Sequence, residues 1–152
     1  MTDMAQETQA RPVFSRERLI RFSDCDAAGI VFYPQYFVMC NGLVEDWFNE
    51  GLGVEYAGLI TRRRVGLPIV RLETDFTSPS HLGDRVVLSL GVERLGSRSL
   101  TLRVQCTGAQ DGVLRMSARL VLVVTSLETH QAIAIPQDVA EAIAQAIRQG
   151  SA

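Results

Sequence analysis

The sequence predicts one α+β domain, in which a curved antiparallel sheet covers a long helix and a short helix follows at the C-terminus. Three patterns lead to this fold class. Apolar residues recur at three- and four-residue spacing between Tyr36 and Phe48, as they do in a helix. They then alternate along four later segments, as in half-buried strands. After Pro136 the four-residue spacing returns, which predicts a second amphipathic helix.

The length of 152 residues fits a single hydrophobic core. We expect residues 1–12 to form a flexible N-terminal tail, because they are polar and show no period, and residues 13–150 to form the domain. An amphipathic sheet and a helix that is apolar over more than half its circumference each need a cover. If the sheet curls around the helix, each covers the apolar face of the other.

The first expected elements are a short strand and the long helix. Residues 18–22 mix apolar and charged side chains, which predicts a half-buried strand. Pro34 suits the first turn of the helix, where a backbone N–H would have no partner. The glycines at positions 51 and 53 predict the end of this helix, and a weakly patterned helix is expected over about residues 54–63.

Four strands are expected next, over residues 67–77, 86–92, 100–106 and 114–124. Asp111–Gly112 predicts a hairpin between the last two, because both residue types tolerate the positive φ of such turns. Short connections make consecutive strands neighbours, so we expect these four to form a meander. The C-terminal helix is marked by Val139, Ile143 and Ile147.

Composition and charge exclude several classes of protein. A net charge of −2 argues against a nucleic-acid binder, for which a basic balance is expected. The apolar runs are far shorter than the ~20 residues that span a bilayer, and the N-terminal residues lack the apolar core of a signal peptide. A cytoplasmic protein is therefore expected. The cysteines at positions 25, 40 and 106 are widely spaced and predict neither a zinc site nor a disulfide.

The segment most informative about function places Asp24 and Asp26 between a strand-like run and the long helix. Asp26 would lie near unpaired N–H groups at the helix start, where a carbonyl can be polarised while the carboxylate attacks it or activates a water. A turn aspartate that only accepts backbone hydrogen bonds is the alternative. For Asp24 we expect a structural role, either bonding turn amides or pairing with an arginine. His81 and His130 are distant from this segment in sequence and there is no Gly-x-Ser-x-Gly elbow, so a Ser–His–Asp triad is not expected.

Residues 24–36, Asp-Cys-Asp-Ala-Ala-Gly-Ile-Val-Phe-Tyr-Pro-Gln-Tyr, resemble the active-site signature of the 4-hydroxybenzoyl-CoA thioesterase family. That family includes the acyl-CoA thioesterases linked to the Tol-Pal system. A second patch, residues 66–70 (Gly-Leu-Pro-Ile-Val) followed by Phe76 and Gly83-Asp84, resembles the strand after the helical region of the same family. The likeness runs from about residue 14 to about residue 136. It implies the hotdog fold, in which a curved antiparallel sheet wraps around a long central helix.

The resemblance also implies roles for individual residues. It places the catalytic carboxylate at Asp26 and a backbone N–H that faces the thioester oxygen at Tyr33. As a glycine, Gly29 would let the backbone approach a substrate or take a positive φ. Asn41 falls where the 4-hydroxybenzoyl-specific enzyme has an aspartate that meets the substrate hydroxyl, and an amide would discriminate less there. Two further sets complete the expected site. A neighbouring subunit's pocket would be lined by Leu67, Pro68 and Ile69, and the CoA phosphates would contact Ser97, Arg98 and Ser99.

We therefore expect an acyl-CoA thioesterase that hydrolyses an aromatic or short-chain acyl-CoA to the free acid and CoA. Asp26 would act as a nucleophile, through a mixed anhydride, or as a general base toward water, and the sequence leaves both routes open. No metal or redox cofactor is expected, because CoA enters as part of the substrate. The resemblance implies a homodimer or homotetramer with its sites at the subunit interface.

Two other functions of the same fold are alternatives. A hotdog hydratase or dehydratase typically works with a histidine, and this chain has Asp26 instead. A non-catalytic module that binds acyl-CoA or acyl-carrier protein would have no need for an ionised carboxylate beside an apolar acyl slot.

Overall fold

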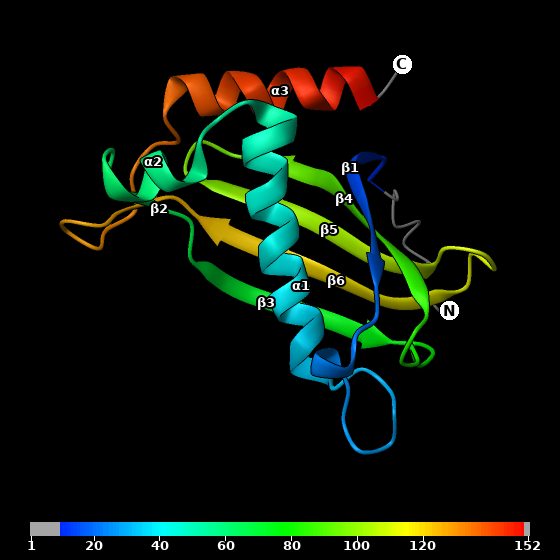
Figure 1. Cartoon of the computed structure of the whole chain (residues 1–152). Helices are drawn as coiled ribbons and strands as arrows, with labels where there is room; N and C mark the ends of the chain where they lie inside the picture. Colours follow the sequence, from blue (N-terminus) through cyan, green and yellow to red (C-terminus); the bar gives the residue numbers. More distant parts are fainter. Residues whose placement is uncertain (1–9, 151–152) are drawn as a thin grey trace, which may run out of the picture.

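A five-stranded antiparallel sheet curves around one long helix in the computed structural model, which describes residues 10–150 (Figure 1). The strands, in their order across the sheet, are β1 (Pro12–Leu19), β4 (Arg85–Leu95), β5 (Ser99–Gly108), β6 (Leu114–Val123) and β3 (Ile69–Phe76). A separate two-stranded sheet pairs β2 (Val65–Gly66) with β7 (Thr125–Ser126). The predicted α+β hotdog architecture is confirmed.

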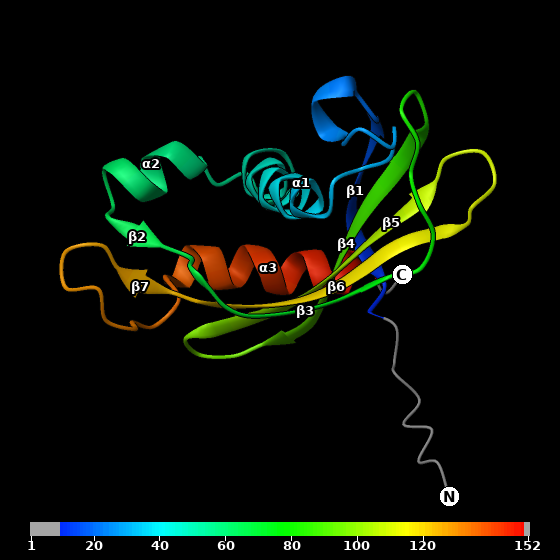
Figure 2. The ribbon, with the colours of Figure 1, turned by 90° about the horizontal axis from the view of Figure 1, so that it is seen from below.

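The helices lie within the curve of the sheet (Figure 2). The long helix α1 (Tyr33–Asp46) continues into a π-helical turn, Trp47–Leu52, which ends at Gly53 with a left-handed φ of 68°. The short helix α2 (Tyr56–Thr61) follows. The last helix, α3 (Gln137–Gly150), crosses the C-terminal end of α1 and contacts β1, β4 and the π-helical turn (Figure 1).

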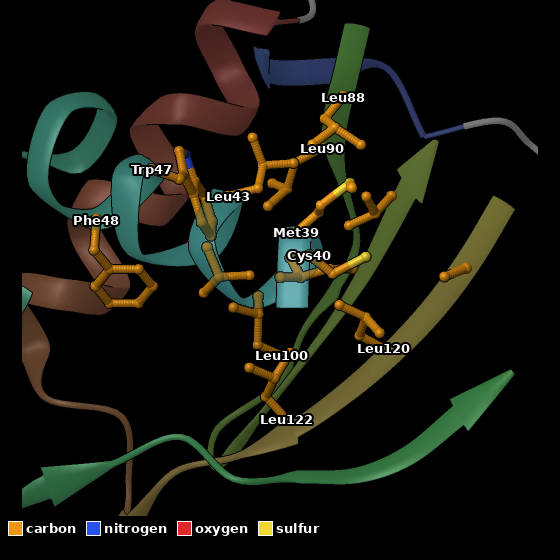
Figure 3. Packing of buried hydrophobic residues seen from close by; sticks show 14 of the residues in the cluster. Met39, Cys40, Leu43, Trp47, Phe48, Leu88, Leu90, Leu100, Leu120 and Leu122 are labelled. Atoms are coloured by element: carbon orange, nitrogen blue, oxygen red, sulfur yellow. The ribbon is translucent and has the colours of Figure 1, made fainter. Parts of the chain in front are cut away.

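The hydrophobic core lies between the concave face of the sheet and one face of α1 (Figure 3). The alternating positions of β4, β5 and β6 point inward there, and the three- and four-residue spacing of α1 turns its apolar positions toward them. The buried contact pairs the helix residues Met39, Cys40, Leu43, Trp47 and Phe48 with the sheet residues Leu88, Leu90, Leu100, Leu120 and Leu122. Each of these side chains is at most 3% exposed.

The first strand is not where the sequence predicted it. It spans Pro12–Leu19, and residues 22–24 form a short 3-10 helix instead of a strand end. Asp24 explains this difference, because its carboxylate accepts a hydrogen bond from the Arg21 N–H at 2.8 Å and its own N–H donates to the Arg21 carbonyl at 2.9 Å. Such local bonds offer the backbone an alternative to a sheet ladder. Of the expected tail, residues 1–9 lie outside the described residues and residue 12 already belongs to β1, so the division into tail and domain stays a prediction.

The predicted four-stranded meander is wrong for β3. This strand pairs with β6, and β1 takes the position beside β4. The connection after β3, residues 77–84, crosses the end of the β5–β6 hairpin, where the N–H groups of Thr77 and Ser78 donate to the carbonyl of Arg115. As a result β3 becomes an edge strand that pairs on one side only within the described residues.

Candidate active site

Asp26 lies in a tight connection between β1 and α1, which we call the Asp26 loop (residues 24–32). The Asp26 N–H donates to the carbonyl of Ile30 and the Gly29 N–H donates to the carbonyl of Asp26, both at 3.0 Å. Gly29 has a φ of 75°, which side chains rarely tolerate, while a Cβ at this position would meet no other atom. Glycine is therefore required by the backbone conformation and not by crowding.

The carboxylate of Asp26 is exposed and only partly engaged. Its Oδ1 accepts a hydrogen bond from the Ala28 N–H at 2.9 Å. Its Oδ2 has no hydrogen-bond partner in the described part of the chain. One oxygen thus fixes the rotamer of the side chain and the other is available to attack a carbonyl or accept a proton.

The start of α1 leaves one N–H group without an acceptor. The Phe32 N–H donates to the carbonyl of Asp24 at 3.0 Å, the Gln35 N–H donates to the carbonyl of Phe32 at 2.8 Å, and Pro34 has no N–H. The Tyr33 N–H finds no acceptor among the residues that the structure describes. A helix start carries a partial positive charge, so this N–H is available to donate to an anion. The oxyanion role that the resemblance implies for Tyr33 stays a prediction.

A second segment holds the Asp26 loop from the other side. The Val31 N–H donates to the carbonyl of Ser80 at 2.9 Å, and the Leu82 N–H donates to the carbonyl of Gly29 at 3.0 Å. Between them His81 forms a backbone bridge with Ile30. His81 is therefore brought beside the Asp26 loop although it is distant in sequence, and no sequence signal indicated this contact.

An apolar pocket of about 350 Å³ opens beside the loop. It is lined by Ile30, Val31, Tyr33, Tyr36, Phe76, Thr77, Ser78 and Pro79. Three hydroxyls in its wall already have partners: Tyr36 donates to Ser80 Oγ at 2.8 Å, and Thr77 and Ser78 each donate to the Leu114 carbonyl at 2.8 Å. The pocket therefore presents mainly aromatic and aliphatic surface to a ligand. Burial raises the pKa of Tyr36, so its hydroxyl stays protonated.

The aromatic side chains of this region contact one another across two elements. The ring centroid of Phe76, on β3, lies 6.2 Å from that of Tyr33 and 5.9 Å from that of Tyr36, both on α1. Phe37 joins the cluster at 6.3 Å from Phe76. Edge-to-face and tilted contacts of this kind leave ring faces available to an aromatic ligand.

The other predicted site residues lie at the far end of the sheet. The predicted pocket residues Leu67, Pro68 and Ile69 lead into β3 at the end opposite Phe76. The predicted CoA-binding residues Ser97, Arg98 and Ser99 occupy the β4–β5 turn, and β4 begins near the Asp26 loop and ends 11 residues later at this turn. At ~3.3 Å per residue, the Asp26 loop and this turn are separated by roughly 35 Å.

The two distant sets lie together. The carbonyl of Pro68 accepts from the Val123 N–H at 3.1 Å, and the carbonyl of Arg98 accepts from the Val124 N–H at 2.8 Å. The predicted site residues thus form two sets at opposite ends of the sheet. We call them the Asp26 half-site, with the apolar pocket, and the Arg98 half-site, with Pro68; that the two act in one kind of site stays a prediction. Asn41 is exposed on α1, about 12 Å along the helix axis from Tyr33.

Other kinds of chemistry find less support at this site. Burial raises the pKa of the Cys25 thiol, and the neighbouring charges of Asp24 and Asp26 raise it further, which disfavours the nucleophilic thiolate. Within residues 10–150 no cluster of three or more His, Cys, Asp or Glu side chains is arranged to hold a metal ion. A polar hollow of about 560 Å³, lined by Glu73, Glu93, Arg103 and Arg119, lies on the outer face of the sheet and not beside Asp26. Nor is any described helix long and apolar enough to cross a membrane.

Comparison with known proteins agrees with the predicted family. The model of the thioesterase-like superfamily matches residues 20–143. A 1,4-dihydroxy-2-naphthoyl-CoA hydrolase of Synechocystis is 28% identical over 125 residues, which cover 82% of this chain and 89% of the relative. The hydrolase of the same name from Synechococcus elongatus is 38% identical over a shorter stretch of 81 residues, 53% of this chain and 59% of the relative.

Solved structures support the same assignment. The 1,4-dihydroxy-2-naphthoyl-CoA thioesterase of Synechocystis superposes with a TM-score of 0.80 at 26% identity, covering 86% of this chain and 95% of the other. A gentisyl-coenzyme A thioesterase gives a TM-score of 0.76 at 27% identity, covering 86% and 99%. A 4-hydroxybenzoyl-CoA thioesterase with bound 4-hydroxybenzoyl-CoA shares the fold, with a TM-score of 0.79 at 24% identity and coverage of 88% and 99%.

The predicted enzyme class, a thioester hydrolase that acts on an acyl-CoA, is confirmed by these relatives. With its family model matched over most of its length and its fold shared with solved thioesterases, this chain belongs to the thioesterase-like superfamily.

Proposed function

We propose that this chain hydrolyses an aromatic acyl-CoA and that Asp26 carries the reaction. The observation that supports this most directly is the arrangement at the start of α1. A carboxylate oxygen of Asp26 has no partner and the Tyr33 N–H has no acceptor among the described residues. Both belong to the short segment that also supplies Ile30, Val31 and Tyr33 to the wall of an apolar, aromatic pocket. These are the three parts that thioester hydrolysis needs: a nucleophile or base, a donor for the oxyanion, and a place for the acyl group.

In the proposed reaction the acyl group enters the pocket and its carbonyl oxygen accepts from the Tyr33 N–H. Asp26 then attacks the carbonyl carbon, the C–S bond breaks, CoA leaves as the thiolate, and water opens the resulting mixed anhydride. Alternatively Asp26 takes a proton from water, which attacks the carbonyl directly. Both routes require the carboxylate form of Asp26, and one fixed oxyanion donor is worth roughly 3 kcal/mol of barrier.

The aromatic substrate class rests on the pocket and on the relatives. The relatives named above act on dihydroxynaphthoyl and gentisyl thioesters. In this chain Tyr33, Tyr36 and Phe76 line the pocket, and ring edges and faces at these distances favour a planar aryl group over a flexible alkyl chain. Asn41 would be the residue that meets a ring substituent, and its amide can both donate to and accept from a hydroxyl.

A dimer is part of the proposal, because one chain separates its two half-sites. The edge strand β3 exposes apolar side chains along its length: Ile69 is 43% exposed, Val70 60%, Leu72 38% and Phe76 48%. Edges of this kind are usually paired or covered. Antiparallel pairing of two β3 edges would bring the Asp26 half-site of one subunit beside the Arg98 half-site of the other. Ser97, Arg98 and Ser99 would then reach the CoA phosphates. A tetramer would pair two such dimers.

The remaining parts of the proposal follow from the chemistry. No metal or redox cofactor takes part, because hydrolysis needs only the carboxylate, the oxyanion donor and water. The proposal also includes the cytoplasmic location that is expected from the sequence.

The test is release of free thiol from a panel of benzoyl-, hydroxybenzoyl-, gentisyl-, dihydroxynaphthoyl- and straight-chain acyl-CoAs. Wild type is compared with Asp26→Asn and with Asp46→Asn, a control of the same chemistry at the other end of α1. We expect aryl esters to be hydrolysed by wild type and by the control but not by Asp26→Asn. Binding of the esters without thiol release by the wild type would instead support the non-catalytic binding module.

A further inference from the structure

Two of the buried polar residues in the described part of the chain hold the Asp26 loop. The buried polar or charged residues there are Asp24, Ser80 and Thr101, at most 5% exposed. Ser80 binds the loop through its backbone carbonyl, whereas Asp24 uses its side chain as well as its backbone. Burial of a charged carboxylate is unfavourable unless it is paired and hydrogen-bonded. The groups that pair with the Asp24 carboxylate therefore show what this residue connects.

Asp24 connects three parts of the molecule. Its Oδ1 accepts from Arg18 Nη2 at 3.0 Å, which ties it to β1, and its Oδ2 accepts from the Arg21 N–H at 2.8 Å, which fixes the turn before Asp26. Its backbone carbonyl accepts from the Phe32 N–H at 3.0 Å. Asp26 lies two residues after Asp24 and Tyr33 directly follows Phe32. Asp24 thus connects the segment that carries the Asp26 carboxylate to the segment that carries the Tyr33 N–H.

Arg18 reaches this position from the inward face of the sheet. It lies opposite Val86, which is fully buried, so its side chain projects to the concave side where α1 lies. Together with Met39, Leu43 and Leu88 it lines the groove between β1 and α1. The Nε of Arg18 is buried and has no hydrogen-bond partner in the structure. An unsatisfied buried donor is unfavourable for stability, so stability alone is a poor reason for an arginine here.

We infer that the Arg18–Asp24 ion pair is a positioning pair for the proposed thioesterase reaction. It sets the separation of the Asp26 carboxylate from the Tyr33 N–H through the backbone of the Asp26 loop. This inference rests on the proposed function. Misplacement of a reacting group by about 1 Å can reduce the rate 10²-fold even when the change is remote from the chemistry. The pair should therefore affect kcat far more than KM.

The experiment compares Asp24→Asn, Arg18→Met, the double variant and Arg18→Lys in the thiol-release assay. We expect each of the first two to lower kcat by about 10- to 100-fold with KM within about twofold. The double variant should lose less than the product of the two single losses, because it leaves no unpaired charge. Arg18→Lys keeps the charge and should recover most of kcat. The inference would be overturned if the loss of kcat in the double variant equalled the product of the two single losses, or if the variants changed KM and left kcat unchanged.

A matched ion pair provides the control for a purely structural role. Arg63, just after α2, makes two hydrogen bonds of 2.8 and 2.6 Å to Asp138 on α3, remote from Asp26. Asp138→Asn should lower the melting temperature without changing kcat. If Asp24→Asn behaves in the same way, with a lower melting temperature and an unchanged kcat, then the pair only stabilises the fold and the inference is wrong.

Amide hydrogen exchange separates failure of this inference from failure of the proposed function. In Asp24→Asn the Phe32 amide, which donates to the Asp24 carbonyl, should exchange at least tenfold faster than in wild type, while the Val31 amide, held by Ser80, should change little. Unchanged exchange at Phe32 would overturn the positioning role whether or not the wild type hydrolyses an ester. A wild type that releases no thiol, while the Phe32 amide is deprotected in the variant, would overturn the proposed function and leave Asp24 as the anchor of the loop.

Discussion

The two ends of α1 have very different surroundings. Toward its C-terminus Leu43, Trp47 and Phe48 are at most 3% exposed, enclosed by the sheet and α3; we call this the closed half. Toward its N-terminus Phe32, Tyr33 and Val38 are 48%, 58% and 60% exposed, beside the Asp26 loop and the edge strand β3; we call this the open half. Both halves are apolar, and Tyr36 of the open half is buried as well, but the open half leaves these three large apolar side chains exposed within one chain.

This difference separates residues that stabilise the fold from residues that are available to bind a ligand or a second subunit. Apolar side chains contribute to stability in proportion to the area they remove from water, so the closed half contributes more to the stability of the monomer than the open half. Contiguous exposed apolar surface usually marks a binding site or an interface. Mutations in the two halves should therefore have opposite profiles, affecting stability in one and activity or assembly in the other.

The largest effect is expected from Asp26→Asn in the open half. Asparagine can still accept the bond from the Ala28 N–H, but it cannot act as a nucleophile or general base. We expect kcat to fall by about 10²- to 10⁴-fold with the melting temperature almost unchanged. Thiol release and thermal unfolding measure the two quantities, and a variant that keeps most of its activity would exclude Asp26 from the chemistry.

Leu43→Ala tests the closed half. Leu43 is 3% exposed, and removal of its side chain leaves a cavity against the sheet. The free energy of unfolding should fall by about 3 kcal/mol, while kcat at a temperature well below the transition should stay within about twofold. Urea unfolding provides the first number and the thiol assay the second. A large loss of kcat in a folded protein would mean that the two halves are not separable.

Leu72→Asp tests the edge of the open half. Leu72 is 38% exposed and lies on the same face of the sheet as Phe76, so a charge there would face the proposed second subunit. We expect a folded monomer in sedimentation and at least a tenfold loss of kcat/KM, because desolvating an unpaired charge at an interface is unfavourable. The control is Val113→Asp on the β5–β6 hairpin, an apolar residue that is 46% exposed and does not belong to β3. An unchanged oligomer in Leu72→Asp would remove β3 from the interface.

The smallest effect is expected on the outer face of the sheet, which belongs to neither half. Burial disfavours ionisation of Glu93, but hydrogen bonds from Arg119 Nε at 2.7 Å and Arg103 Nε at 2.9 Å outweigh it and lower the pKa of Glu93 below its usual value. A carboxyl group with a lowered folded-state pKa contributes stability above its unfolded pKa of about 4.3 and loses it as pH falls through the folded-state value. Glu93→Gln should therefore remove at most about 1 kcal/mol at pH 7 and flatten the decline in stability below pH 5, measured by urea unfolding across pH.

The fold class was predictable because its strongest signals are local. The apolar residues of α1 recur every three or four positions, and those of β4, β5 and β6 alternate, so each pattern lies within one segment. The structure has these elements where the sequence predicted them. The pairing of β3 with β6 was not predictable from connection lengths, because a short loop allowed the chain to cross the end of a hairpin. The start of β1 was missed because its exposed and half-buried positions carry too little apolar contrast.

The arrangement of the candidate site was predictable where its residues are consecutive in sequence, while the roles of these residues stay predictions. The Asp26 loop and the start of α1 form one continuous segment, so the resemblance could name Asp26 and Tyr33 together. The contacts of Ser80 and His81 with this loop, and the hydroxyl pair of Tyr36 with Ser80, come from 44 or more residues away and left no local signal. The separation of the two half-sites is likewise a property of the sheet and not of any motif.

The single tryptophan gives the closed half an optical reporter of its own. Trp47 is 0% exposed and packs edge to face on Phe48 at 5.6 Å between ring centroids, so its fluorescence should be blue-shifted and inaccessible to soluble quenchers. The open half contains no tryptophan and carries Tyr33 and Tyr36 instead. Emission excited at long wavelength would therefore follow loss of the closed half alone, and binding of an aryl ester or separation of two subunits should leave it unchanged.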